Sequence, residues 1–147
     1  MEIHRSKTVP YTSDQMYGVV NDIQHYHEFL PWCRDASVSR QSESRLTATV
    51  FVAIGKIKQS FTTENTMQPG KKIRMQLVDG PFKNLHGIWK FEQIPQGQCR
   101  VSLDIEFEFK NKLLKLALGK TFNHIMESMV ESFSRRAEQL YGKQGSS

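Results

Sequence analysis

Two histidines lie two residues apart in the segment HYH, residues 25–27, and paired histidines are common zinc ligands. On a helix, side chains at positions i and i+2 point roughly 200° apart, so His25 and His27 cannot easily share one ion. No cysteine or carboxylate cluster joins them at the spacing of a known metal site. We therefore interpret both as surface residues and predict no metal site.

Three carboxylates occupy alternate positions in the segment VSLDIEFEF, residues 101–109. A pair of carboxylates can hydrolyse a glycosidic bond, but only when both line a cleft. Asp104, Glu106 and Glu108 alternate with large apolar residues, which must face a core if the segment is a strand. The pattern therefore predicts a solvated sheet face and not an acid–base pair.

Other catalytic signatures are absent from the sequence. There is no GxSxG segment, no phosphate-binding glycine loop and no nucleophile paired with a base in a known motif. An enzyme with an internal cavity would need a polar group inside it, and His86, His124 and Tyr17 are the only candidates. None of them belongs to a catalytic pattern, so we predict no catalytic residues.

The chain has 147 residues and a net charge of +5. This length fits one domain, which we expect to span residues 1–142, with a disordered tail at 143–147. No window approaches the ~20 apolar residues of a membrane span, and the first residues lack the apolar core of a secretory signal. Cys33 and Cys99 form no CxxC motif, so we expect free thiols in a reducing cytoplasm. The charge favours anionic partners, either lipid headgroups or RNA.

Helical periodicity appears at both ends of the chain. Residues 11–23 predict a helix that Thr12 or Ser13 can cap, and residues 24–29 predict a short second helix. Near the C-terminus, apolar residues recur every three or four positions from 112 to 141, which predicts a helix of roughly 45 Å. This last helix is the only element long enough to cover a sheet.

Between the helices the period changes to two. Residues 36–109 alternate apolar and polar side chains, and their turn signals divide them into about six antiparallel strands. The N-terminal segment IHRSKTVP adds an edge strand. Because a sheet with one apolar face needs a cover, the pattern predicts an α+β fold. In it, a curved antiparallel sheet of about seven strands grips the long C-terminal helix, and the two short helices close one end.

One helix about 10 Å wide cannot cover seven strands spaced ~4.8 Å apart unless the sheet curls tightly. Several residues expected on the facing surfaces are small or flexible, which favours a partly open apolar cavity. We expect it to have the ~300–1,000 Å³ of an ordinary ligand pocket. The alternative, in which the same residues fill the core, stays open. The expected interior lining is Met75, Leu85, Trp89, Phe122 and Met126.

The first expected rim segment is FLPWC, residues 29–33. A connection between elements is normally polar, yet this one begins with Phe29, Leu30, Pro31 and Trp32. Its apolar destination could be the core, a ligand, a membrane or a partner, and we favour the mouth of a lipid site. On that interpretation, Trp32→Ala weakens ligand binding more than it lowers stability.

The second expected rim segment is DGPF, residues 79–82. Gly80 and Pro81 are typical turn residues, and we expect Phe82 at the tip of the turn, opposite the first segment.

The segment LLKLALG, residues 113–119, begins the long helix with apolar residues nearly all round. In one interpretation Leu113 and Leu114 pack on the end of the sheet. In the other, Leu113 and Leu116 belong to a lip that touches lipid while flanking lysines meet phosphates. Those lysines are Lys110, Lys112, Lys115 and Lys120.

Basic clusters occur elsewhere, at residues 56–58, 71–74 and 135–136. No RRM, KH or dsRBD signature accompanies them, and no aromatic residues are interleaved to stack bases. The sequence therefore predicts no sequence-specific RNA recognition and no DNA partner. Docking of a basic face on ribosomal RNA stays open, because phosphate contacts need no motif.

Four segments together resemble a known family: residues 9–33, LVDGPFKNLHGIWKF, CRVSLDIEFEFKN and the final helix. They are similar to the ubiquinone-binding START-like family of the polyketide cyclase/START superfamily, which includes bacterial proteins of the ribosome-association toxin A type. The resemblance covers essentially the whole chain. It implies a helix-grip (START/Bet v 1-like) fold, a cavity for an isoprenoid quinone and no intrinsic catalysis. Its implications for single residues extend to the Leu-Pro-Trp and Gly-Pro-Phe segments, residues 30–32 and 80–82.

From the residues and the resemblance we expect a non-catalytic module that binds ubiquinone or a related prenyl lipid. It would act as a chaperone or presenter in support of respiratory electron transport, with peripheral contact to the inner membrane. It would need no cofactor beyond the bound lipid. The alternative, which the resemblance also implies, is a translation inhibitor that binds the large ribosomal subunit and blocks subunit association.

Overall fold

The structure is a computed structural model that describes residues 1–142; the tail expected at 143–147 lies outside the described residues. Its elements follow the predicted order of one strand, two short helices, six strands and one long helix. In chain order they are β1 (Glu2–Val9), α1 (Ser13–Asn21), η1 (Ile23–Glu28), β2 (Cys33–Ser42), β3 (Arg45–Ile54), β4 (Ile57–Gln68), β5 (Lys72–Asp79), β6 (Phe82–Ile94), β7 (Gln98–Phe109) and α2 (Lys112–Tyr141).

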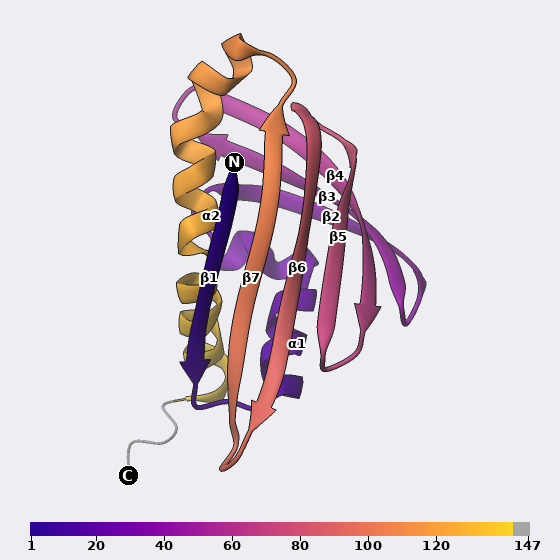
Figure 1. Cartoon of the computed structure of the whole chain (residues 1–147), viewed down its shortest axis with the longest axis vertical. Coiled ribbons are helices and arrows are strands. Elements are labelled where there is room, and N and C mark those ends of the chain that lie inside the picture. Colours follow the sequence, from indigo (N-terminus) through magenta and orange to yellow (C-terminus); the bar gives the residue numbers. More distant parts are fainter. Residues whose placement is uncertain (143–147) are drawn as a thin grey trace.

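All seven strands form one antiparallel sheet in the order β1-β7-β6-β5-β4-β3-β2. The sheet bends strongly. In Figure 1, β1, β7 and β6 run alongside α2, while β2, β3 and β4 cross obliquely behind it. The predicted helix-grip architecture is therefore confirmed, and it places the inner face of the sheet around α2.

Several elements differ from the prediction in bounds or in type: α1 is shorter than the predicted 11–23, and η1 and β2 begin earlier than expected. The second short helix, η1, is a 3₁₀ helix. Strand β2 begins at Cys33 and not at Ala36, because Cys33 already pairs with Val52 ahead of an irregularity between Cys33 and Asp35. A shift of register breaks the alternation that marks a strand in the sequence. The expected cap of α1 is present, since Thr12 accepts a hydrogen bond from the backbone N–H of Gln15 at 3.1 Å.

Helix α2 begins where the side chain of Asn111 accepts a hydrogen bond from the backbone N–H of Leu114, at 2.9 Å. Its apolar positions form one stripe that faces the sheet, as the spacing predicted. The buried residues of the stripe are Leu118, Gly119, Phe122, Ile125, Met126, Met129, Val130, Phe133 and Ala137.

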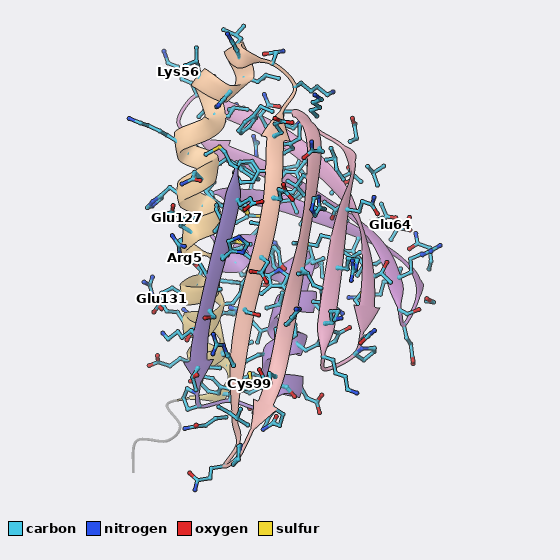
Figure 2. The ribbon with its side chains drawn as sticks, in the orientation of Figure 1. Arg5, Lys56, Glu64, Cys99, Glu127 and Glu131 are labelled. Carbon is cyan, nitrogen blue, oxygen red and sulfur yellow. The ribbon has the colours of Figure 1, made fainter. Side chains whose placement is uncertain are left out.

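Ion pairs close one side of α2 against the edge strand β1. Arg5 lies 3.6 Å from Glu127, and Lys7 lies 2.8 Å from Glu131. Figure 2 shows Arg5, Glu127 and Glu131 between the two elements. The hydrogen bond from Lys7 also lowers the pKa of the Glu131 carboxyl. Exposed pairs of this kind each contribute little free energy, but together they fix β1 beside the helix. On the other side of α2, no ion pair among the described residues joins the helix to β2 or β3, and the one pair there is between Arg136 and Glu28 of η1.

Candidate functional site

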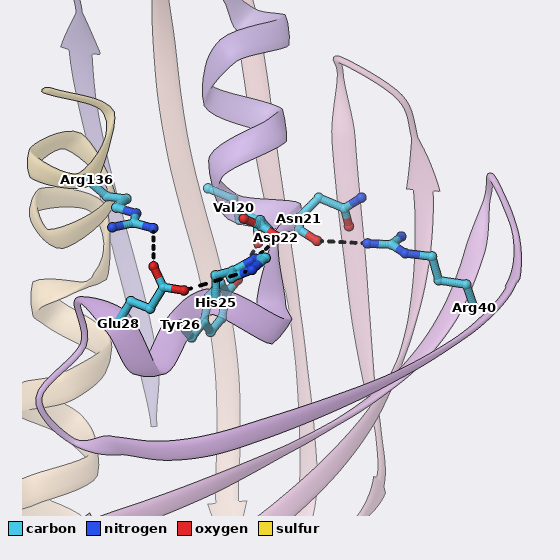
Figure 3. A network of polar contacts seen from close by, with 8 residues as sticks. All are labelled: Val20, Asn21, Asp22, His25, Tyr26, Glu28, Arg40 and Arg136. Atoms are coloured by element: carbon cyan, nitrogen blue, oxygen red, sulfur yellow. Dashed lines mark hydrogen bonds and ion pairs between the residues drawn. The ribbon is translucent and has the colours of Figure 1, made fainter. Parts of the chain in front are cut away.

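The short helix η1 fixes the corner that leads into β2. The hydroxyl of Tyr26 donates a hydrogen bond to the backbone carbonyl of Val20 in α1. At the start of η1, Nδ1 of His25 lies 2.7 Å from Oδ1 of Asp22 (Figure 3). This hydrogen bond raises the pKa of His25, so the carboxylate favours the protonated imidazole. These contacts tie η1 to α1.

A second set of contacts ties η1 to α2. Arg136 Nη2 lies 3.1 Å from Glu28 Oε1, as Figure 3 shows. The same guanidinium lies 4.8 Å from the ring centre of Phe29, within the range of a cation–π contact. Phe29 packs edge-on against Phe133, with ring centres 5.6 Å apart. The corner is thus held from both sides.

The apolar corner turns mostly inward. Leu30 is 1% exposed and Trp32 is 7% exposed, whereas Pro31 is exposed. The turn is closed by a hydrogen bond from the N–H of Cys33 to the carbonyl of Leu30, at 3.0 Å. The corner therefore packs into the protein's own interior, with Pro31 at the surface.

An open groove of about 870 Å³ lies outside this corner, between α2 and the hairpin that joins β3 to β4. One wall is largely apolar and includes Phe29, Pro31 and Ile54. The α2 wall is polar and includes Ser128, Ser132 and Arg135. This groove occupies the side of α2 that β1 leaves uncovered.

A cavity of about 60 Å³ lies inside, between the sheet and α2. Trp32 is the one residue that lines both the groove and the cavity. The cavity is far smaller than the ~300–1,000 Å³ of an ordinary ligand pocket. The volume that we expected from the sequence is therefore wrong for this cavity. The expected interior residues that do line it are Met75, Leu85, Trp89, Phe122 and Met126.

Two polar residues, Thr63 and Asn65 of β4, also line the cavity, and the sequence analysis missed them. They are 6% and 3% exposed, and the Thr63 hydroxyl donates to Asn65 Oδ1 at 2.8 Å. Five consecutive polar residues, at positions 62–66, hide the alternation there. The neighbouring inward residues Phe61 and Met67 carry the signal that could have found them, because positions 63 and 65 share their face.

The second expected rim segment is not a rim. Pro81 is buried, and Phe82 is 2% exposed and begins β6 opposite Phe109. Its ring centre lies 4.8 Å from that of Phe122 and 5.0 Å from that of Phe109. Gly80 has a φ of 153°, and a Cβ there would lie 2.8 Å from the Cβ of Phe61. This close turn leaves Phe82 in the core, so its expected place at an exposed tip is wrong.

The start of α2 projects from the same end of the molecule. Leu113 and Leu116 are 77% and 84% exposed, whereas Leu114 is half-buried and packs against the core. Of the two interpretations, packing on the sheet is wrong for Leu113. The flanking lysines are exposed and take part in no ion pair among residues 1–142: Lys110, Lys112, Lys115 and Lys120.

The catalytic candidates do not converge. His86 lies on the outer sheet face, 3.0 Å from Glu106, and His124 lines the open groove. Tyr17 packs edge-on against Phe91, and burial raises the pKa of its hydroxyl. In the part of the chain that the structure describes, no three His, Cys, Asp or Glu side chains lie close enough to hold a metal ion. No described helix is long and apolar enough to cross a bilayer.

Comparison with known sequences identifies the class. The polyketide cyclase/dehydrase and lipid transport family matches residues 9–134, and the chain belongs to this family. In solved structures, the fold is similar to the Zhui aromatase/cyclase from Streptomyces sp. R1128, with a TM-score of 0.83, 12% identity and coverage of 95% of this chain and 94% of that one. At this identity the likeness shows the fold alone.

Relatives at higher identity are not named as enzymes. The chain is 45% identical over 142 residues to the ribosome association toxin RatA of Vibrio cholerae, covering 97% of this chain and 99% of the relative. It is 28% identical to the mitochondrial coenzyme Q-binding protein COQ10 homolog B of Xenopus laevis, covering 98% of this chain and 61% of that protein. The resemblance to the START-like family is therefore confirmed.

Proposed function

We propose that the protein binds ubiquinone or a related prenyl quinone without catalysing a reaction on it, and presents the lipid to other components at a membrane. The observation that carries this proposal is the apolar cavity beneath α2, which shares one lining residue, Trp32, with a large open groove. The coenzyme Q-binding relative supports it.

The cavity must widen to take a quinone ring, and its lining is suited to widening. Three of the lining residues are Met75, Met126 and Met129, whose unbranched side chains adapt to irregular shapes. The groove outside Trp32 has the volume of an ordinary ligand site. The ring would then occupy the widened cavity, and part of the prenyl chain would lie in the groove.

Energetics favour presentation over long-distance transport. Burying one isoprene unit is worth about 4 kcal/mol relative to water, but almost nothing relative to a bilayer that is equally apolar. The protein cannot extract a quinone by hydrophobicity alone. It can exchange one if it docks on the bilayer, and exposed Leu113 and Leu116 among lysines provide a surface for docking. Apolar insertion combined with cationic contacts is the usual basis of such binding.

The test uses fluorescence, because both tryptophans of the chain line the cavity. Protein purified without detergent is analysed by native mass spectrometry and then titrated with vesicles that contain a prenyl benzoquinone. We expect near-stoichiometric quinone and quenched tryptophan emission. Vesicles that contain the same amount of a prenyl alcohol serve as the control. A protein that carries no quinone and shows no quenching beyond the control would refute the proposal.

A second candidate function is association with the large ribosomal subunit. The 45% identical relative is named for ribosome association. A second groove, of about 660 Å³, lies beside the turn that joins β4 to β5 and supports the idea. Its charged lining is four basic residues and two carboxylates: Lys71, Lys72, Lys90, Arg100, Asp14 and Glu92. Lys72 lies directly opposite Lys90 in the strand register. Like charges at paired positions destabilise a sheet, and a polyanion such as rRNA would relieve the repulsion.

Salt dependence separates this function from lipid binding. Binding through phosphates weakens steeply as salt rises, whereas occupancy of an apolar cavity hardly changes. We expect Lys72→Ala/Lys90→Ala to reduce co-sedimentation with large subunits and to flatten the salt dependence. The exposed pair Lys112→Ala/Lys115→Ala is the matched control. An equal loss of co-sedimentation in both double variants would mean that binding depends on overall positive charge and that the groove is not the ribosome-binding surface.

A further inference from the structure

The inward face of β4 carries an unusual pair of residues. Thr63 and Asn65 are the only buried polar residues among residues 1–142, and apolar Phe61 and Met67 flank them on the same face. Both line the cavity, whose other walls are almost entirely apolar. A strand facing a core ordinarily carries apolar residues at such positions.

The hydrogen bonds of Asn65 are incomplete. Its Oδ1 accepts the bond from the Thr63 hydroxyl, but its Nδ2, which carries two N–H donors, bonds to no described residue. Among the described residues, Asn21 Oδ1 is the one sealed polar side-chain atom that lacks a partner. Nδ2 of Asn65 therefore keeps some accessible surface, and that surface can only be the cavity, because the residue as a whole is 3% exposed.

An unbonded amide N–H is costly to bury, whereas an apolar side chain of the same size would be favourable there. The adjoining residues leave room for a partner. Asn65 pairs with Met75 in the register, and Met75 pairs with Gly87. The Met75 methyl lies 3.0 Å from where a Gly87 Cβ would stand, so it fills the space that the glycine leaves. Movement of this flexible side chain would open space directly beside Asn65.

We propose that Asn65 Nδ2 donates a hydrogen bond to a ring carbonyl oxygen of the bound quinone, and that Thr63 is a positioning residue that holds the amide with its N–H groups toward the cavity. This inference rests on the proposed lipid-binding function and adds a head-group contact to it. A quinone carbonyl is an acceptor only, which suits a site that offers donors. The apolar prenyl chain gives the site affinity, and Asn65 gives it selectivity for a carbonyl-bearing ring.

The test compares two probes of equal chain length: a dimethoxy-methyl-benzoquinone with two isoprene units, and a benzene ring with the same chain and no carbonyl. We expect the wild-type protein to bind the quinone about tenfold more tightly than the arene, which corresponds to about 1.4 kcal/mol. Asn65→Leu should reduce this ratio to near one while arene affinity is unchanged. Thr63→Val/Asn65→Leu, which replaces both polar partners together, should raise the urea midpoint, because it removes the unsatisfied amide donor without leaving the Thr63 hydroxyl unpaired.

Asn65→Asp is the second single variant. It preserves the size and the acceptor for Thr63, and above the pKa of the new carboxyl it offers no donor, so the ratio should again fall when binding is measured at high pH. Infrared difference spectra provide an independent readout: one quinone carbonyl band should be lowered in frequency in the wild-type complex and restored in both single variants. A ratio and a spectrum that do not change would overturn the Asn65 contact and leave lipid binding intact.

Two other outcomes would also overturn the proposed contact between Asn65 and the quinone. A lower urea midpoint in Thr63→Val/Asn65→Leu with an unchanged probe ratio in Asn65→Leu would mean that the amide holds structure or a buried water, and would overturn the contact. If neither probe binds to the wild-type protein, the lipid-binding function itself fails and the contact fails with it.

Discussion

Two parts of the core differ in how they are packed. Toward the start of α2, aromatic rings from β4, β6, β7 and α2 pack together in edge-on and tilted pairs, and the remaining recess holds only about 20 Å³. Phe82 alone lies within 6.1 Å of four other rings, centre to centre. In the middle of the sheet, three methionines and the Thr63–Asn65 pair are among the residues that line a cavity of about 60 Å³.

This difference assigns separate tasks to the two parts. Interlocked rings resist deformation, since each ring occupies a fixed angle to its neighbours and interiors pack as densely as crystals. The aromatic end can therefore hold the exposed start of α2 in a fixed position. Thioether side chains rearrange at little cost, so the middle can admit a ligand. On this view, affinity and stability depend on different residues.

The largest expected effect is on stability at the aromatic end. Phe82→Ala should lower the free energy of unfolding by about 3–5 kcal/mol, because it removes a fully buried ring from a cluster that cannot collapse around the space. Met75→Ala in the middle should cost about 2 kcal/mol or less, since Met75 is only half-buried and already borders empty space. Urea unfolding measures both. Equal losses would contradict the division into a rigid and an adaptable part.

The next largest effect concerns membrane docking at the tip that the aromatic end supports. Leu113→Ser/Leu116→Ser should weaken binding to anionic vesicles about a hundredfold, because each exposed leucine contributes on the order of 1.5 kcal/mol or more when buried in lipid. Stability should change by less than about 0.5 kcal/mol. Vesicle sedimentation measures the binding.

Leu140→Ser is the matched control for docking, because Leu140 is 51% exposed at the other end of the same helix. It should leave vesicle binding unchanged. A loss in the control as large as in the double variant would mean that exposed leucines act without regard to position, and the tip would not be a docking surface.

Ligand affinity in the adaptable part gives a smaller effect. In Gly87→Ala the new methyl group would lie 3.0 Å from the Met75 methyl and 3.2 Å from Ile105 Cγ1, so Met75 must move toward the cavity. We expect quinone affinity to fall several-fold and stability to change by about 1 kcal/mol or less. Fluorescence titration and urea unfolding check the two values. Unchanged affinity would show that the space over Gly87 is not used by the ligand.

Many of the residues in the aromatic end and in the adaptable middle of the core could be predicted from the periodicity of apolar residues in the sequence. The positions of Trp89 and Met126 follow from strand and helix periods, since each belongs to a long apolar series. Phe82 was misplaced because a two-residue turn at Gly80 and Pro81 puts it into β6 at once, and strand register is not visible in a single sequence. Thr63 and Asn65 were missed because local polarity hides the face to which a residue belongs.

The role of Trp32 shows the same limit. The apolar corner predicted that Trp32 is buried but not what it contacts, and in the structure Trp32 lines both the groove and the cavity. At 7% exposure it is also a core residue, so Trp32→Ala should cost about 3–5 kcal/mol. The expectation that this variant affects binding more than stability is therefore replaced. Trp32→Phe, which preserves an aromatic ring, is the better probe of the mouth.

The smallest effect is kinetic, and the two cysteines report it. Burial raises the pKa of Cys33 and of Cys99 to about 11 in each case, so the two thiols are equally unreactive in the closed protein. Cys33 directly follows Trp32, whereas Cys99 is 0% exposed at the start of β7, away from the groove. If the corner opens to admit ligand, an alkylating reagent should modify Cys33 several-fold faster than Cys99, and bound quinone should slow only Cys33.

The pH dependence of alkylation identifies the state that reacts. A thiol that reacts in place gains thiolate up to its raised pKa, so its rate should rise tenfold per pH unit until about pH 11. A thiol that reacts only from an open corner has an ordinary pKa there, and its rate should level off near pH 8.5. We expect the second profile for Cys33, measured by mass spectrometry of the modified peptides. Equal rates for Cys33 and Cys99 at every pH would mean that both react through global unfolding, and the middle of the core would then be no more adaptable than the aromatic end.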